Sequence, residues 1–113
     1  MNFKTSQQGG ATVIELDGNL LGGPDAGALK SKLHELVESG KKHVVVDLKG
    51  VEFMNSSGLA MLINALTTMK NSGGGLKIAN ASDKIAALIK VTKLSGMFEN
   101  HTSVSDAAAA FKK

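Results

Sequence analysis

The sequence predicts an α/β protein with a mixed central sheet and helices packed mainly on one face. Three observations support this fold class. Short apolar or alternating runs are interleaved with segments of helical periodicity, in the order β-β-α-β-α-β-α-β-α. The first two strands are separated only by a glycine turn, which predicts a hairpin and therefore a sheet that is not purely parallel. The length of 113 residues and the 42% hydrophobic content fit one domain over residues 1–113.

The first third of the chain predicts a hairpin and a helix. Apolar and polar residues alternate over residues 11–17, and the turn at Gln8-Gly9-Gly10 allows pairing with a strand at residues 2–6. Pro24 suits the first position of a helix, and Asp25 faces the positive end of its dipole. Gly40 ends this helix. Its apolar positions recur at helical spacing: Ala26, Leu29, Leu33, Leu36 and Val37.

The middle of the chain predicts a buried strand and a second helix on the same face of the sheet as the first. Residues 43–48 form a mostly apolar run between glycine signals, which is typical of a central parallel strand. Right-handed crossovers place two successive helices on one face if strands are added in one direction. The second helix ends in the polar and glycine-rich residues 71–75, and its apolar face consists of Leu59, Leu62, Ile63, Leu66 and Met69.

The last third predicts a strand at residues 76–79, two helices and a weak extended piece. We expect Ser82 to cap the third helix and Ser95-Gly96 to end it. The third helix should face inward through Ile85, Leu88, Ile89 and Thr92. The extended piece falls near Phe98 or Thr102, and a last helix follows, capped by Ser105 and packed through Ala108 and Phe111.

Composition argues against several classes of function. There are no cysteines, so disulfides, thiolate metal sites and a cysteine nucleophile are excluded. The net charge of +3 comes from lysines without any arginine, and the aromatic residues are four phenylalanines, a poor set for reading or stacking on nucleic acid. No apolar run has the roughly 20 residues of a membrane span, and no signal peptide is visible. We expect a cytoplasmic protein without nucleic-acid binding or stable membrane insertion.

Catalytic and metal sites are also unsupported by the sequence. His34, His43 and His101 lack metal-ligand spacing. Neither glycine cluster fits a phosphate-binding P-loop, and no nucleophile elbow surrounds the serines. We therefore expect no enzyme activity, no cofactor and no metal.

The cluster Asn55-Ser56-Ser57-Gly58 is the most informative polar segment of the chain. It follows the predicted buried strand and a loop, and it lies at the entrance to the second helix. Asparagine and serine are common helix caps, so a purely structural role is one interpretation. A helix N-terminus also favours an anion, and open α/β sheets carry functional loops at the carboxyl ends of their strands. An exposed, modifiable serine is the other interpretation.

The same segment resembles the signature of the STAS domain, especially that of bacterial anti-sigma factor antagonists. The resemblance rests on the strand ending in Asp47-Leu48, on Phe53 and on the tetrad at residues 55–58, where the family commonly has an acidic residue first. It extends over nearly the whole chain: Gly18-Asn19-Leu20 is similar to an early family element, and residues 94–98 are similar to a later one.

The resemblance implies a phosphorylation switch rather than an enzyme. In the family, the unphosphorylated protein binds an anti-sigma factor and frees the sigma factor. The anti-sigma factor is itself a serine kinase that phosphorylates the first serine of the tetrad, and a serine phosphatase reverses the reaction. By position that serine is Ser56, Ser57 would cap the helix, and Gly58 would allow close approach of another backbone. The partner surface would comprise Asn55, Ser56, Ser57, Gly58, Leu21, Gly22 and Met61.

Two departures from the family pattern concern the same surface. Asn55 keeps the size of the usual acidic residue but lacks its charge, and Leu21-Gly22 stand where the family often has an acidic residue after the leucine. Met61 fits either the core or an adaptable partner surface.

Two rival functions remain open from the sequence, and both involve a STAS domain. One is a partner-switching module acting on a target other than a sigma pathway, such as a response regulator or a signalling complex. The other is a small STAS subunit of a lipid-transport ATPase complex. For all of these we expect a monomer.

Overall fold

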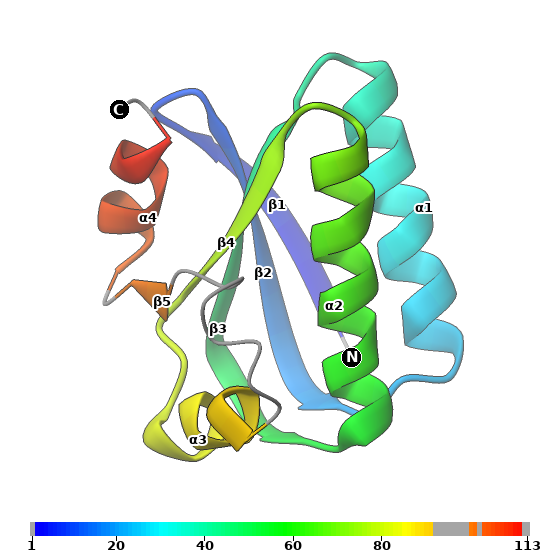
Figure 1. Cartoon of the computed structure of the whole chain (residues 1–113), viewed down its shortest axis with the longest axis vertical. Helices are drawn as coiled ribbons and strands as arrows, with labels where there is room; N and C mark the ends of the chain where they lie inside the picture. Colours follow the sequence, from blue (N-terminus) through cyan, green and yellow to red (C-terminus); the bar gives the residue numbers. More distant parts are fainter. Residues whose placement is uncertain (1, 92–99, 102, 112–113) are drawn as a thin grey trace.

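Five strands form one sheet with the spatial order β1-β2-β3-β4-β5 (Figure 1). The computed structural model describes residues 2–91, 100–101 and 103–111. The strands are β1 (Asn2–Gln8), β2 (Ala11–Leu20), β3 (His43–Met54), β4 (Gly75–Ala79) and β5 (Asn100–His101). The helices are α1 (Pro24–Glu38), α2 (Ser56–Asn71), α3 (Asp83–Val91) and α4 (Val104–Ala110).

The sheet is mixed, as predicted. β1 pairs antiparallel with β2, and β2, β3, β4 and β5 pair in parallel. The hairpin turns through Gly9 and Gly10 alone, with φ of 57° and 88°. Positive φ at both turn positions matches the right-handed twist of the strands and strongly favours glycine. The predicted hairpin is therefore confirmed.

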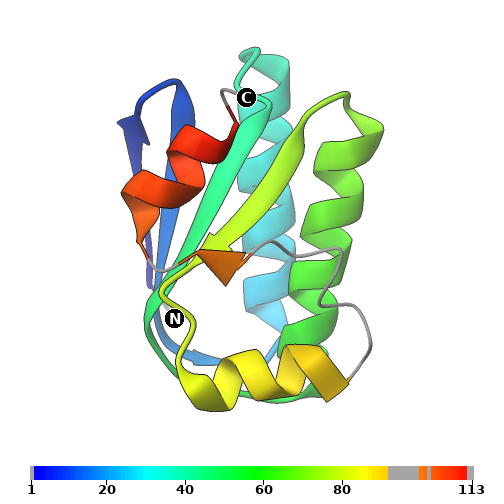
Figure 2. The same ribbon diagram turned by 60° about the vertical axis from the view of Figure 1, so that its left-hand side comes forward.

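Two layers of apolar residues cover the two faces of the sheet. α1 and α2 lie side by side on one face, over the large core that includes Ile14, Leu33, Val46 and Leu62 (Figures 1 and 2). α4 lies on the other face, where Ala107 and Ala108 pack against a smaller group of residues from β2, β3 and β4. The prediction that the first two helices share a face is confirmed.

β2 and β3 are longer than the sequence predicted. β2 continues beyond residue 17 to Leu20, and β3 continues beyond residue 48 to Met54, so the expected loop over residues 49–54 is wrong. The two strands stay paired through this region, with Gly18 opposite Val51 and Leu20 opposite Met54. As a result, both strands reach the start of α2 together.

The helix caps confirm one prediction and correct another. The Ser82 hydroxyl oxygen accepts a hydrogen bond from the Ile85 N–H at 3.2 Å, so Ser82 caps α3 as predicted. α4 is capped by Ser103 and not by Ser105, because the Ser103 oxygen accepts from the Asp106 N–H at 3.1 Å. Ala108 and Phe111 pack as expected.

Part of the last third lies outside the described residues. This applies to Thr92, to the predicted end of α3 at Ser95-Gly96, and to Phe98 and Thr102. β5 lies between the latter two positions and is two residues long. Within the described ranges, no helix combines the length and apolar character that spanning a bilayer requires.

Candidate functional site

The tetrad at residues 55–58 lies where β2 and β3 end and α2 begins. β3 ends at Met54, α2 begins at Ser56, and Asn55 is the single residue between them. The Asn55 N–H donates to the Leu20 carbonyl at 3.3 Å, which joins the end of β3 to the end of β2. The site is therefore built at the carboxyl edge of two paired parallel strands, the usual location of functional loops in open α/β sheets.

Asn55 is the cap of α2, which corrects the expectation that Ser57 has this role. Its backbone is extended, with φ −100° and ψ −177°, and its side-chain oxygen accepts from the Gly58 N–H at 2.8 Å. The Asn55 carbonyl accepts from the Leu59 N–H at 2.9 Å. Asn55 thus satisfies an N–H group of the first turn that would otherwise lack a partner.

Replacing Asn55 by alanine is expected to reduce the free energy of unfolding by about 1 kcal/mol, because the Gly58 N–H loses its acceptor. Asn55→Asp keeps that acceptor and should retain the stability, since a carboxylate at a helix N-terminus is also favourable. Urea unfolding followed by circular dichroism measures both changes. Equal stability of Asn55→Ala and the unmodified protein would show that the cap is not stabilising.

Ser56 is the first residue of α2, and its side chain is exposed. Within the described part of the chain, its hydroxyl makes no hydrogen bond. The first turn of α2 contains no acidic residue, so negative charge added there meets the positive end of the helix dipole without local repulsion. The hydroxyl is thus accessible and suited to modification by an anionic group.

Ser57 and Gly58 are held against the end of β2 by two close approaches. Gly22 has φ +83°, and a Cβ on it would lie 2.7 Å from the Ser57 Cβ. A Cβ on Gly58 would overlap the Leu20 carbonyl oxygen. The expectation that Gly58 allows another backbone to approach is therefore confirmed, and that backbone belongs to the chain itself.

Two large apolar side chains are exposed in the described chain, and both belong to the strand ends beside this site. Leu21 follows β2 and is 47% exposed, and Phe53 is 42% exposed one residue before the end of β3. The ammonium of Lys84 in α3 lies 5.4 Å from the centre of the Phe53 ring. Both residues thus lie at the end of the sheet that carries the tetrad, which makes this end the candidate surface for a partner.

Phe53 and Lys84 were not predicted as part of a partner surface. Phe53 lies one residue from the buried Met54 on β3 and so faces the opposite side of the sheet, which becomes apparent only once β3 is seen to extend to Met54. The contact of Lys84 with Phe53 brings together two elements that are distant in the sequence, and no local pattern indicates it.

Met61 does not belong to the exposed site. It is 4% exposed and lies in the large core cluster, because α2 packs against α1 as well as against the sheet. This favours the core interpretation of Met61 over the partner interpretation. Gly22 and Gly58 are also buried, and they shape the site through close packing.

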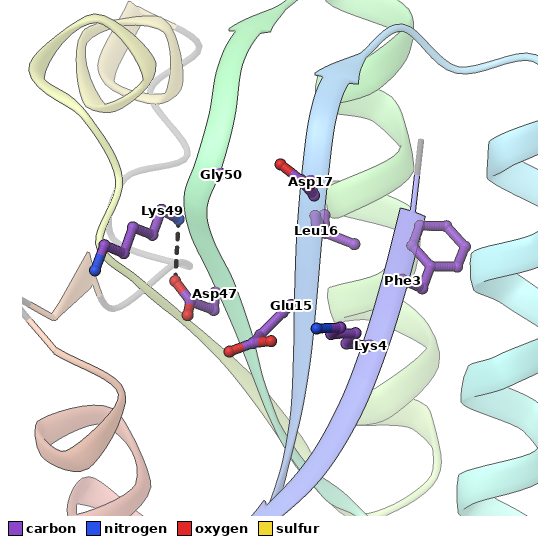
Figure 3. Close-up of a pocket in the computed structure, with 8 residues that line it drawn as sticks. All are labelled: Phe3, Lys4, Glu15, Leu16, Asp17, Asp47, Lys49 and Gly50. Atoms are coloured by element: carbon purple, nitrogen blue, oxygen red, sulfur yellow. Dashed lines mark hydrogen bonds between the residues drawn. The ribbon is translucent and has the colours of Figure 1, made fainter.

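The chain also has a cavity on the face of the sheet that carries α4. It has a volume of about 810 Å³, and its charged lining residues are Lys4, Glu15, Asp17, Asp47 and Lys49 (Figure 3). The buried Asp47 carboxylate accepts from the Lys49 N–H and from the Asn80 amide, both at 3.0 Å. Both hydrogen bonds of Asp47 are therefore made to groups of the protein itself. The cavity lining carries charges of both signs, so it does not indicate a ligand of one particular charge.

Comparison with known proteins identifies the family. Residues 2–107 match the model of the STAS domain. The anti-sigma-B factor antagonist of Bacillus subtilis is 32% identical over 74 residues, which are 66% of this chain and 67% of that protein. That of Staphylococcus aureus is 28% identical over 61% of this chain, and the match spans 64% of its own length.

A solved structure shows the same fold along nearly the whole chain. The anti-sigma factor antagonist from Mycobacterium paratuberculosis has a TM-score of 0.82 at 22% identity, covering 99% of this chain and 94% of that one. Because the family model spans most of the chain, this protein belongs to the STAS domain family.

Proposed function

We propose that this protein is an anti-sigma factor antagonist whose binding is switched by phosphorylation of Ser56. In this proposal the unphosphorylated protein binds an anti-sigma factor that is also a serine kinase, and thereby releases a sigma factor in the cytoplasm. A serine phosphatase restores the binding form. The protein acts as a binding partner and kinase substrate rather than as an enzyme, and it needs no cofactor.

The observation that carries the proposal is the exposed Ser56 hydroxyl at the N-terminus of α2. Leu21 and Phe53, the two exposed large apolar residues of the described chain, adjoin the paired residues Leu20 and Met54 at the same end of the sheet, so a partner that covers this end also covers the hydroxyl. The names of the curated relatives support the same class of function. Asn55, Ser57 and Leu21 are the further exposed contacts that we propose, with Gly22 and Gly58 as the packing that supports them.

Phosphorylation at this position changes binding without changing the fold. A phosphate adds about −1.5 to −2 charges, which the helix N-terminus tolerates. At a covered interface the same charge must lose its water unless a cation meets it. A cost of about 3–4 kcal/mol lowers the affinity by two to three orders of magnitude, at tenfold per 1.4 kcal/mol.

Incubation with ATP and the cognate anti-sigma factor kinase, followed by mass mapping of the modified residue, tests the site. We expect one phosphate on Ser56 in the unmodified protein and none on the Ser56→Ala variant, while Ser57→Ala is still phosphorylated. Phosphate on Ser57 alone would overturn the assignment of Ser56. A lack of phosphate on either serine would overturn the switch itself.

A further inference from the structure

β1 leaves one edge of the sheet open. It is the first strand in the sheet order and pairs on one side with β2, while in the described chain no strand lies on its other side (Figure 2). Residues 4–8 are all exposed. Natural edge strands are commonly protected by proline, bulges or charges. β1 has seven residues in continuous register, no proline and a single charged side chain, Lys4.

The turn geometry shows which backbone groups point away from β2. Gln8 and Ala11 flank the two-residue turn and so form a hydrogen-bonded pair. Hydrogen-bonded pairs alternate with non-hydrogen-bonded pairs along an antiparallel ladder. The N–H and C=O groups of Phe3, Thr5 and Gln7 therefore point to the open side.

In contrast to the monomer expected from the sequence, we infer that a second copy of this chain pairs antiparallel with the open edge of β1, about a two-fold axis at Thr5. In this register Thr5 faces Thr5 of the second copy. Phe3 of each copy faces Gln7 of the other. Each such pair exchanges two N–H···O bonds, so every outward-pointing group of these three residues gains a partner. The two sheets become one continuous sheet.

Charge and strand length favour this register and this closed form. An axis at Lys4 would place two lysines directly opposite each other, which is unfavourable, whereas the axis at Thr5 places each Lys4 opposite Ser6. Lys4 and Phe3 point to opposite faces of the sheet (Figure 3). The other edge strand, β5, has two residues and offers little for head-to-tail pairing. A two-fold contact closes on itself and stops at a dimer.

The inference is independent of the proposed function. The Ser56 site lies at the carboxyl ends of β2 and β3, beyond the end of the sheet rather than along the β1 edge. A two-fold axis perpendicular to the sheet places the two Ser56 sites at opposite ends of the dimer. Both remain open, so failure of one proposal leaves the other intact.

Cross-linking tests the pairing directly, because the chain has no cysteine. In the Thr5→Cys variant the two thiols face each other with Cα atoms about 5.5 Å apart, within disulfide range. Mild oxidation should yield a covalent dimer for most of the protein. Ser6→Cys is the matched control: its two copies lie diagonally, about 7–8 Å apart, and should remain mostly uncross-linked. Equal cross-linking of both variants, or preferred cross-linking of Ser6→Cys, would overturn the register.

Charge variants test the contact without oxidation. Sedimentation equilibrium of the unmodified protein should show the mass rising with concentration from 11.7 kDa toward twice that value. Thr5→Lys and Thr5→Glu should each stay at the mass of one chain, because like charges then meet at the axis. Their equimolar mixture should regain the dimer. An unmodified protein that stays monomeric at millimolar concentration, or a mixture that stays monomeric, would overturn the inference.

Discussion

The Ser56→Asp variant is expected to bind the cognate anti-sigma factor at least 100-fold more weakly than the unmodified protein while remaining fully folded. The carboxylate lies at the first position of α2, where negative charge is favourable by about 0.3–1 kcal/mol, so the melting temperature should be unchanged or slightly higher. Binding is weakened because the charge must be desolvated beneath the partner. Isothermal titration calorimetry and thermal unfolding measure the two quantities separately.

Two neutral variants serve as controls for this prediction. Ser56→Asn introduces a side chain of nearly the same shape as the aspartate of Ser56→Asp, but without its charge. Ser56→Ala removes the hydroxyl. We expect Ser56→Ala to bind constitutively and Ser56→Asn to bind much more tightly than Ser56→Asp. If Ser56→Asp and Ser56→Ala bound the anti-sigma factor equally well, charge at this position would not control binding.

The Gly58→Ala variant is expected to lose about 3 kcal/mol of stability, the upper end of the usual cost of overpacking. The added Cβ overlaps the Leu20 carbonyl oxygen, which belongs to backbone that also accepts the Asn55 N–H. Overpacking against backbone costs more than the roughly 1 kcal/mol that alanine gains over glycine inside a helix. For a chain of this size the melting temperature should fall on the order of 10 °C.

Gly27→Ala in α1 is the matched control. A Cβ there meets nothing within 4 Å, so the same substitution should stabilise the protein by about 0.5–1 kcal/mol. Calorimetric scans of both variants measure the difference. A Gly58→Ala protein as stable as Gly27→Ala would show that the close approach of α2 to β2 is not required.

The element order could be predicted from the sequence because each element carries a local signal. The paired glycines of the hairpin, Pro24 at the start of α1 and the apolar run of β3 all act within a few residues. The positions of these elements in the structure agree with those signals. Right-handed crossovers then place α1 and α2 on one face, given that β2, β3 and β4 are added in one direction across the sheet.

The lengths of β2 and β3 could not be predicted by the same reasoning. Gly50 is the glycine that follows the apolar run of residues 43–48 and favours a strand end there, yet it pairs with Asp17 inside the sheet. A Cβ on Gly50 would lie 2.9 Å from the Leu16 carbonyl oxygen, so glycine is needed there for close approach of two strands. The register shifts between residues 15 and 20 also interrupt the alternation that identifies a strand.

The cap of α4 was predictable in principle. Ser103 precedes Asp106 by three residues, the spacing of a capping box, and this signal favours Ser103 over Ser105. The position of Ser56 followed from its place after a strand and before a helix. Its neighbours Leu21 and Phe53 required the pairing of β2 with β3, which is a tertiary feature.

The central claim is that the charge state of Ser56 sets the affinity for the anti-sigma factor. The most direct measurement compares the dissociation constant of the unmodified protein with that of the same protein phosphorylated stoichiometrically at Ser56, before and after phosphatase treatment. We expect phosphorylation to weaken binding 100-fold to 1,000-fold, by about 3–4 kcal/mol, and phosphatase treatment to restore it. Equal affinities of the phosphorylated and unphosphorylated protein would contradict this account.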